Sequence, residues 1–152
     1  MKKHIWVLFL FILLTLVMLR PLPQKMGNSL VDLGDSVLNT WILSWDIHKF
    51  TTDIKGFFDA NIFYPHRLTL AYSEHFVASA LLVLPIWLIS KNMIFSFNFI
   101  FLLSFVLCGF GTYLLVYKLT KNRLAGIISG IIFAFCPFRL SRLYHLQVLT
   151  AQ

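Results

Sequence analysis

Long apolar runs separated by one polar stretch dominate the chain. The runs cover residues 5–19, 76–90, 93–117 and 124–136, and most of the charged side chains lie between residues 20 and 75. An α-helix rises about 1.5 Å per residue, so the run at 93–117 is long enough to cross a bilayer core of about 30 Å. The pattern predicts an all-α integral membrane protein with about three transmembrane helices and with amphipathic interfacial helices in a long first outer loop.

The first two apolar runs each allow two interpretations. The run at 5–19 has the length of a signal peptide, but the sequence RPLPQKMG that follows it lacks a small-x-small cleavage site. This favours a retained anchor that extends over 5–22. The run at 76–90 is short and contains Pro85, so it is either a full span or a helix that stays at the interface. The other two spans are expected at 93–117 and 124–137.

Basic residues next to the apolar runs set the expected orientation. Lys2 and Lys3 place the N-terminus in the cytoplasm, and 118–123 is the densest basic loop between two runs, so it is expected there too. The run at 93–117 must then pass from outside to inside, which keeps 76–90 on the outer side. The competing arrangement counts 76–90 as a full span and gives four spans with an external basic loop.

The favoured arrangement treats residues 1–152 as one membrane domain with two extracytoplasmic parts. These parts are the loop at 23–92, with interfacial helices at about 34–50 and 76–90, and the segment at 138–152. All six acidic residues lie between positions 32 and 74. One outer loop therefore holds all the carboxylate chemistry of the chain.

The stretch at 34–50 has the spacing of an amphipathic helix. Its apolar stripe consists of Val37, Leu38, Trp41, Ile42 and Trp45. Asp35, Asn39 and Asp46 lie on the opposite face, at positions i, i+4 and i+11. Such a helix is expected to lie in the membrane interface, with its tryptophans toward the lipid and its acids toward water.

Two acidic residues have both a structural and a functional interpretation. Asp35 follows Gly34 at the start of the expected helix, so it is either the N-cap or a catalytic carboxylate, and Asp32 is the rival cap. Glu74, with Ser73, precedes the next helix and either caps it or lines a polar pocket.

A second polar group follows the third expected span. Arg139, Arg142 and His145 are either interfacial anchors or ligands of an anionic, lipid-linked substrate, because arginine forks suit phosphate. The net charge of +7 is scattered over short loops rather than gathered in one stripe, so no nucleic-acid partner is expected. No histidine pair or cysteine cluster has metal-ligand spacing. Close helix packing is predicted at Gly109, Gly111, Gly126 and Gly130.

Three segments together resemble the N-terminal part of bacterial multi-spanning glycosyltransferases of the GT-C fold. The segments are GDSVLNTWILSW, FFDANIFYPHRLTLAYSEH and YKLTKNRLAGIISGIIFAFCPFRLSRLYHLQ. The resemblance implies a partial GT-C fold in the bacterial cytoplasmic (inner) membrane. It also implies that a sugar passes from a polyprenyl-phosphate donor to an acceptor on the outer face. Members of the superfamily usually have many more spans, so the chain is expected to be an N-terminal fragment or to work with a partner subunit.

The resemblance also implies roles for individual residues. Asp35, in the GD that precedes the amphipathic helix, would be the general base or would orient the acceptor. The expected substrate-binding residues are Glu74, His75, Arg139, Arg142, His145 and Gln147. No cofactor is implied, and the involvement of a divalent metal stays open. The competing class of function is a non-catalytic membrane subunit that binds polyprenyl-phosphate or an assembly partner.

Overall fold

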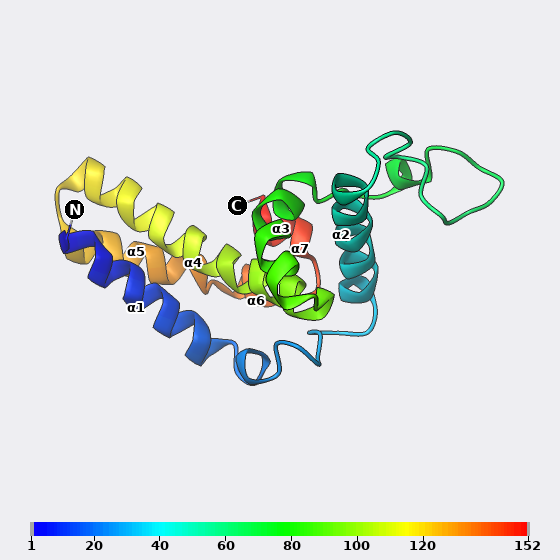
Figure 1. Ribbon diagram of the computed structural model, residues 1–152. Coiled ribbons are helices and arrows are strands. Elements are labelled where there is room, and N and C mark those ends of the chain that lie inside the picture. The colour runs from blue at the N-terminus through cyan, green and yellow to red at the C-terminus, as the bar shows by residue number, and fades with distance from the viewer. Residues whose placement is uncertain (1, 152) are drawn as a thin grey trace. The chain divides into compact units, whose positions relative to one another are not determined.

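Helices make up the regular structure of the protein. The computed structural model describes the backbone of residues 2–151 and the side chains of residues 4–151 (Figure 1). Every regular element in this range is helical, which confirms the all-α prediction. Residue contacts divide the chain into two compact units. Unit 1 consists of Met1–Lys25 and Phe101–Gln152, and unit 2 consists of Met26–Ile100.

The two units share one long helix and otherwise hold separate elements. Unit 1 contains α1 (Lys2–Met18), η1 (Leu22–Gln24), the second part of α4 (Met93–Thr120), α5 (Arg123–Ala134), α6 (Pro137–Leu140) and α7 (Leu146–Thr150). Unit 2 contains α2 (Asp35–Thr51), η2 (Thr69–Tyr72), α3 (Val77–Ser90) and the first part of α4. The helices predicted at about 34–50 and 76–90 are thus present as α2 and α3.

Two helical segments are long and apolar enough to cross a membrane, judged by length and composition among the described residues. They are α4 and the segment Arg123–Leu140, which contains α5 and α6. α4 includes the span predicted at 93–117 and continues to Thr120. The basic loop predicted at 118–123 therefore shortens to a tight turn, in which Asn122 caps α5.

The first predicted span ends earlier than expected. α1 ends at Met18 and is followed by a turn and by η1, so the predicted continuation of the helix to Leu22 is wrong. The residue before a proline is pushed out of the helical region, which affects Arg20 before Pro21. With its 17 residues, α1 is about 25 Å long.

The third predicted span, 124–137, is interrupted near its end. α5 ends at Ala134, and Pro137 starts α6 as a first-turn residue. Proline has no backbone N–H to continue the hydrogen bonding of α5, but its fixed φ suits the first turn of a new helix. The helical path therefore breaks between α5 and α6.

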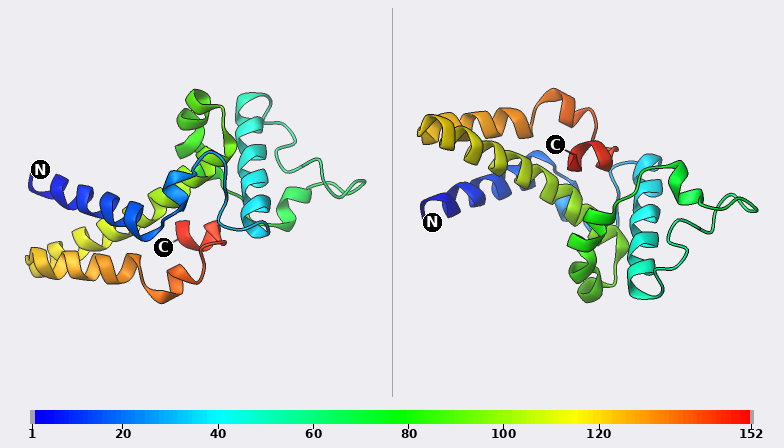
Figure 2. Two further views of the ribbon diagram at one scale, coloured as in Figure 1. Left: turned by 90° about the horizontal axis from the view of Figure 1, so that it is seen from below. Right: turned by 90° about the horizontal axis from the view of Figure 1, so that it is seen from above.

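In unit 1, α1 packs antiparallel to α4. Near the start of α1, His4 Nδ1 lies 2.8 Å from the hydroxyl oxygen of Tyr113, and the His4 ring lies 5.2 Å from that of Tyr117. Further along α1, Phe11 lies against Gly109, so the residue number rises along α1 as it falls along α4. Figure 1 and Figure 2 show the N-terminal end of α1 beside the turn between α4 and α5.

The contact between α4 and α5 depends on glycine, as the sequence predicted at Gly126 and Gly130. A Cβ on Gly130 would lie 2.5 Å from the carbonyl oxygen of Gly109, and a Cβ on Gly126 would lie 2.9 Å from that of Tyr113. The two backbones therefore approach as closely as only glycine allows. The prediction is wrong for Gly111, where no heavy atom lies within 4 Å of the position of an added Cβ.

The outward surface of unit 1 is apolar. Val7, Phe11, Val106 and Tyr113 form the buried cluster, yet large apolar side chains stay exposed on all three helices. Examples are Trp6 on α1, Leu119 on α4 and Leu124 on α5. An extended apolar surface marks a site of contact with lipid or protein, which agrees with a membrane-associated chain.

Two asparagines, one just before α4 and one in its second turn, hold the first residues of unit 2. The Asn98 side-chain amide donates to the carbonyl oxygens of Met26 at 2.8 Å and Ser29 at 2.7 Å. The Asn92 side-chain amide donates to the carbonyl oxygen of Gly27 at 3.0 Å. The chain at 26–29 is thus held against the start of α4 before it continues to α2.

Candidate functional site

The first turn of α2 is capped by Asp32 rather than by Asp35. Asp32 accepts hydrogen bonds from Gly34 N through Oδ2 at 2.7 Å and from Ser36 N through Oδ1 at 3.1 Å. Asp35 is the first residue of the helix, so the interpretation of Asp35 as the N-cap is wrong. The capping role belongs to its rival, which lies outside the helix.

Hydrogen bonds fix the charge of Asp32. Partial burial raises the pKa of Asp32, but hydrogen bonds from Ser36 and from the backbone of Gly34 and Asp35 outweigh this effect, so the pKa lies below its ordinary value. Asp32 is therefore an anion at neutral pH. A capping anion held in this way is a poor proton acceptor, so a general base must come from another carboxylate.

The polar face of α2 is buried, and part of its apolar face is exposed. Asn39 and Asp46 are 2% and 0% exposed, whereas Val37 and Leu38 are each 45% exposed. The prediction that the acids of this helix point toward water is therefore wrong for Asp46. A buried carboxylate requires hydrogen-bond partners, and Asp46 has one at the start of the next helix.

Asp46 connects α2 to the start of α3. Its Oδ2 accepts a hydrogen bond from Phe76 N at 3.1 Å, and its buried Oδ1 has no hydrogen-bond partner among residues 4–151. Burial raises the pKa of Asp46 to about 6, although the bond from Phe76 N and the charge of His75 act in the opposite direction. Asp46 is thus a carboxyl group that changes its charge near physiological pH, a property that is common at catalytic sites.

The segment before α3 is not capped in the way that the sequence suggested. Ser73 Oγ donates to Glu74 Oε2 at 3.0 Å, and both side chains stay outside the helix. The N-cap residue of α3 is Phe76, and no side chain of its own caps the helix. The N-cap position thus belongs to Phe76 rather than to Ser73 or Glu74, and the Phe76 N–H donates to the carboxylate of Asp46.

Asp46 was not among the predicted site residues, although the sequence carried a signal for it. It lies at i+11 from Asp35 and shares a helix face with Asn39, and it is flanked by the apolar Trp45 and Ile47. Unit 2 therefore places two carboxylates on one face of α2, with Glu74 and His75 in the segment that the second carboxylate holds.

In unit 1, Arg139 is an interior residue. It is 0% exposed, its Nη1 donates to Leu149 O at 3.2 Å, and its guanidinium carbon lies 4.6 Å from the centroid of the Phe105 ring. Arg139 thereby holds α7 against α4 through a charged hydrogen bond and a cation–π contact. The interpretation of Arg139 as an exposed interfacial anchor is wrong, and its role in binding substrate stays a prediction.

The other predicted residues of this group lie on or beside α6 and α7. Arg142 is exposed, with its guanidinium 5.9 Å from the ring centroid of Phe138. His145 is half-buried, with its ring centroid 4.4 Å from that of Tyr144. Gln147 is half-buried on α7. A pocket shared by this group and by the carboxylates of unit 2 stays a prediction.

Metal-ligating side chains do not cluster in the described part of the chain. Among residues 4–151, no three His, Cys, Asp or Glu side chains gather where they could hold a metal ion.

Comparisons with protein-family models, with curated proteins and with solved structures find no match for the chain.

Proposed function

We propose that the chain is a membrane glycosyltransferase, or the N-terminal module of one, with a partial GT-C fold. It transfers a sugar from a polyprenyl-phosphate donor to an acceptor at the extracytoplasmic face of the bacterial cytoplasmic membrane. The observation that carries the proposal is the packing of α2. Its polar face points inward and holds the buried Asp46 next to His75. The sequence resemblance supplies the class of reaction, and the geometry supplies a helix face suited to acid–base chemistry.

The packing of unit 1 favours three spans over four. α1 and α4 pack antiparallel, so they cross a membrane in opposite directions. If α3 also crossed between them, α1 and α4 would have to cross in the same direction. The antiparallel arrangement therefore supports the proposal that α3 stays on the outer side and that the basic turn at 118–123 lies on the same side as the N-terminus. With Lys2 and Lys3 in the cytoplasm, α2, α3 and the segment at 138–152 lie outside.

Asp35 is the general base of the proposed reaction. An acceptor hydroxyl gives its proton to this carboxylate while its oxygen bonds to the anomeric carbon of the sugar. The polyprenyl-phosphate leaves with the electron pair of the broken C–O bond, and its charge needs cations rather than an acid. The exposed Arg142 is the residue that we expect to supply such a cation. Glu74 and His75, both exposed, hold the hydroxyls of the sugar or of the acceptor.

The exchange Asp35→Asn tests the proposal in membranes that contain the full-length protein. Sugar transfer from a polyprenyl-phosphate donor is expected to fall on the order of 10²–10⁴-fold, as for a lost general base. The amount of inserted protein is expected to stay the same. Asp53→Asn is the matched control, because Asp53 is an exposed carboxylate in the loop after α2 whose Oδ1 accepts from Lys55 N at 2.9 Å. This variant is expected to keep the wild-type rate.

Two other outcomes would change the assignment. Unchanged transfer in Asp35→Asn would remove this residue from catalysis. Absence of transfer in the wild type, together with specific binding of polyprenyl-phosphate, would instead favour a non-catalytic membrane subunit.

A further inference from the structure

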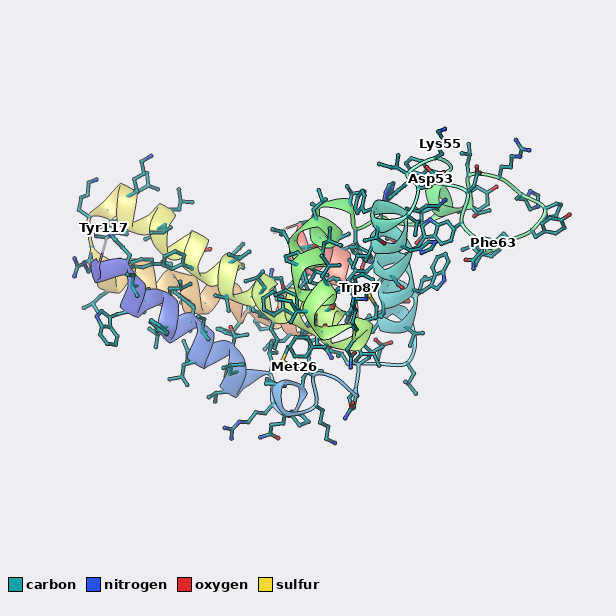
Figure 3. The ribbon with its side chains drawn as sticks, in the orientation of Figure 1. Met26, Asp53, Lys55, Phe63, Trp87 and Tyr117 are labelled. Atoms are coloured by element: carbon teal, nitrogen blue, oxygen red, sulfur yellow. The ribbon has the colours of Figure 1, made fainter. Side chains whose placement is uncertain are left out.

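An apolar surface continues from α2 onto the loop that follows it. We call this surface the apolar patch, and it consists of Val37, Leu38 and Trp41 on α2 together with Ile62, Phe63 and Tyr64 on the loop. Phe63 and Tyr64 are 61% and 97% exposed. Figure 3 shows Phe63 on the loop that extends from the C-terminal end of α2.

A groove lies between the two parts of the apolar patch. It has a volume of about 410 Å³, and its lining includes Leu38 and Trp41 from α2 and Phe63 and Tyr72 from the loop. A second, more open hollow of about 650 Å³ continues past Val37 along the same helix. The patch is therefore a furrowed apolar surface rather than a set of isolated side chains.

Hydrogen bonds close the loop at its base. Leu70 N donates to Phe58 O at 3.0 Å, and Thr69 Oγ1 donates to Ala60 O at 3.0 Å. Both Thr69 and Leu70 are 1% exposed. A loop with joined ends and its own packed base is an Ω-loop, a form that often serves binding. The aromatic residues Phe63 and Tyr64 thus lie at the tip of a loop whose base is closed by hydrogen bonds.

A cation borders the apolar patch, while the acids of the loop are engaged with its own backbone. Arg67 follows the tip of the loop. Asp59 Oδ1 accepts from Leu68 N at 2.8 Å, and Asp53 Oδ1 accepts from Lys55 N at 2.9 Å. An apolar surface with a cation at its border is complementary to a phospholipid layer, in which acyl chains lie beneath anionic phosphates.

We propose that the apolar patch docks on the surface of a phospholipid bilayer, with acyl-chain segments in its groove and Arg67 at the level of the lipid phosphates. The arrangement of α2 fits contact with lipid, because its polar face is buried while Val37 and Leu38 face outward. The same chain contains segments that are long and apolar enough to span a membrane, so we expect a bilayer to be available to the patch. The proposal does not depend on sugar transfer.

Fluorescence from single labelled positions tests the docking. The chain of residues 1–152, with Cys108→Ala and Cys136→Ala to remove the two cysteines of this sequence, is reconstituted in vesicles of phosphatidylcholine with a minority of phosphatidylglycerol. An environment-sensitive dye is attached through Tyr64→Cys or, in a second variant, through Val37→Cys. Both positions are exposed, so the label does not disturb a core. Asp53→Cys is the matched control, since Asp53 is exposed but lies outside the patch.

Blue-shifted emission and several-fold stronger quenching by nitroxide-labelled lipids are expected at positions 64 and 37 than at position 53. Arg67→Glu is expected to weaken the quenching at position 64, because it replaces attraction to phosphate by repulsion. Equal quenching at all three positions overturns the proposal, whether it is weak or strong. Protection of position 64 from aqueous iodide without quenching by lipid also overturns it, and assigns the patch to a protein partner.

Discussion

The two units of the protein differ in the groups that join neighbouring helices. Unit 1 joins α4 to α5 through apolar side chains and glycine, as where Gly130 approaches the carbonyl oxygen of Gly109. Unit 2 joins α2 to α3 through a polar atom, the carboxylate oxygen of Asp46 that accepts the Phe76 N–H. Apolar side chains and glycine carry no group that titrates, whereas a buried carboxyl group changes its charge with pH. We therefore expect the packing of unit 1 to be insensitive to pH and the packing of unit 2 to respond to it.

The largest effect is expected when a side chain is added at Gly130. A Cβ there would lie 2.5 Å from Gly109 O and 2.6 Å from the ring of Phe11, so Gly130→Leu must push α5 away from α4. The free energy of unfolding is expected to fall by about 3 kcal/mol, as for severe overpacking. Thermal unfolding in detergent, followed by size-exclusion chromatography, measures the loss. Gly111→Leu is the matched control, because its position is open, and equal losses in both variants would contradict the glycine contact.

The pH response of unit 2 follows from the pKa of Asp46. This pKa is raised from 3.8 to about 6 in the folded chain, so between these values the folded state holds a proton that the unfolded state has released. The free energy of unfolding therefore falls as the pH rises from about 4 to about 6, and it stays at the lower level above that range. The contribution of Asp46 to stability is thus largest in acid.

Asp46→Asn is expected to remove this pH response. Asparagine accepts the Phe76 N–H bond through its Oδ1 but carries no charge, so at about pH 8 the variant is expected to be more stable than the wild type by about 1–3 kcal/mol. Denaturant unfolding at about pH 5 and about pH 8 measures the difference. The exposed Asp53→Asn is expected to leave the response unchanged. A response that persists in Asp46→Asn would show that another group causes it.

The smallest effect is expected at the start of α2. Asp32→Ala removes the acceptor of the Gly34 and Ser36 N–H groups and is expected to cost about 1 kcal/mol. Because the pKa of Asp32 is lowered by folding, its contribution is present at neutral pH and is lost as the pH falls through the folded value. Hydrogen exchange at the Ser36 amide measures the loss of the cap. Asp35→Ala is expected to leave this amide protected, and equal exposure in both variants would contradict the capping role.

Local signals in the sequence predicted the helices well and their faces poorly. Apolar runs and prolines act within a few residues, which is why α2, α3 and α4 lie close to their predicted ranges and why the position of Pro137 explains the break after α5. The face that α2 buries depends on Phe76, which lies far along the chain. The same spacing fits a helix with its acids in water and a helix with its acids packed inward, so the pattern could not decide between them.

The candidate site shows the same division between local and distant causes. The choice between Asp32 and Asp35 as the cap was visible in the sequence as two alternatives, and it was decided by hydrogen bonds within one turn. The interior position of Arg139 was not predictable, because it depends on Leu149 O and on the ring of Phe105. Asp46 was missed for a similar reason, since its perturbed pKa comes from burial against α3.

The split of unit 1 along the chain has a consequence for biogenesis. Phe11 packs against Gly109 and Gly130, but all of unit 2 is synthesised between α1 and these glycines. Throughout that interval the contact face of α1 has no protein neighbour from α4 or α5, and in the proposed membrane arrangement lipid would cover it. A nascent chain that stalls within unit 2 would therefore leave α1 as an unpaired hydrophobic segment, the form in which quality-control proteases of the membrane would meet it.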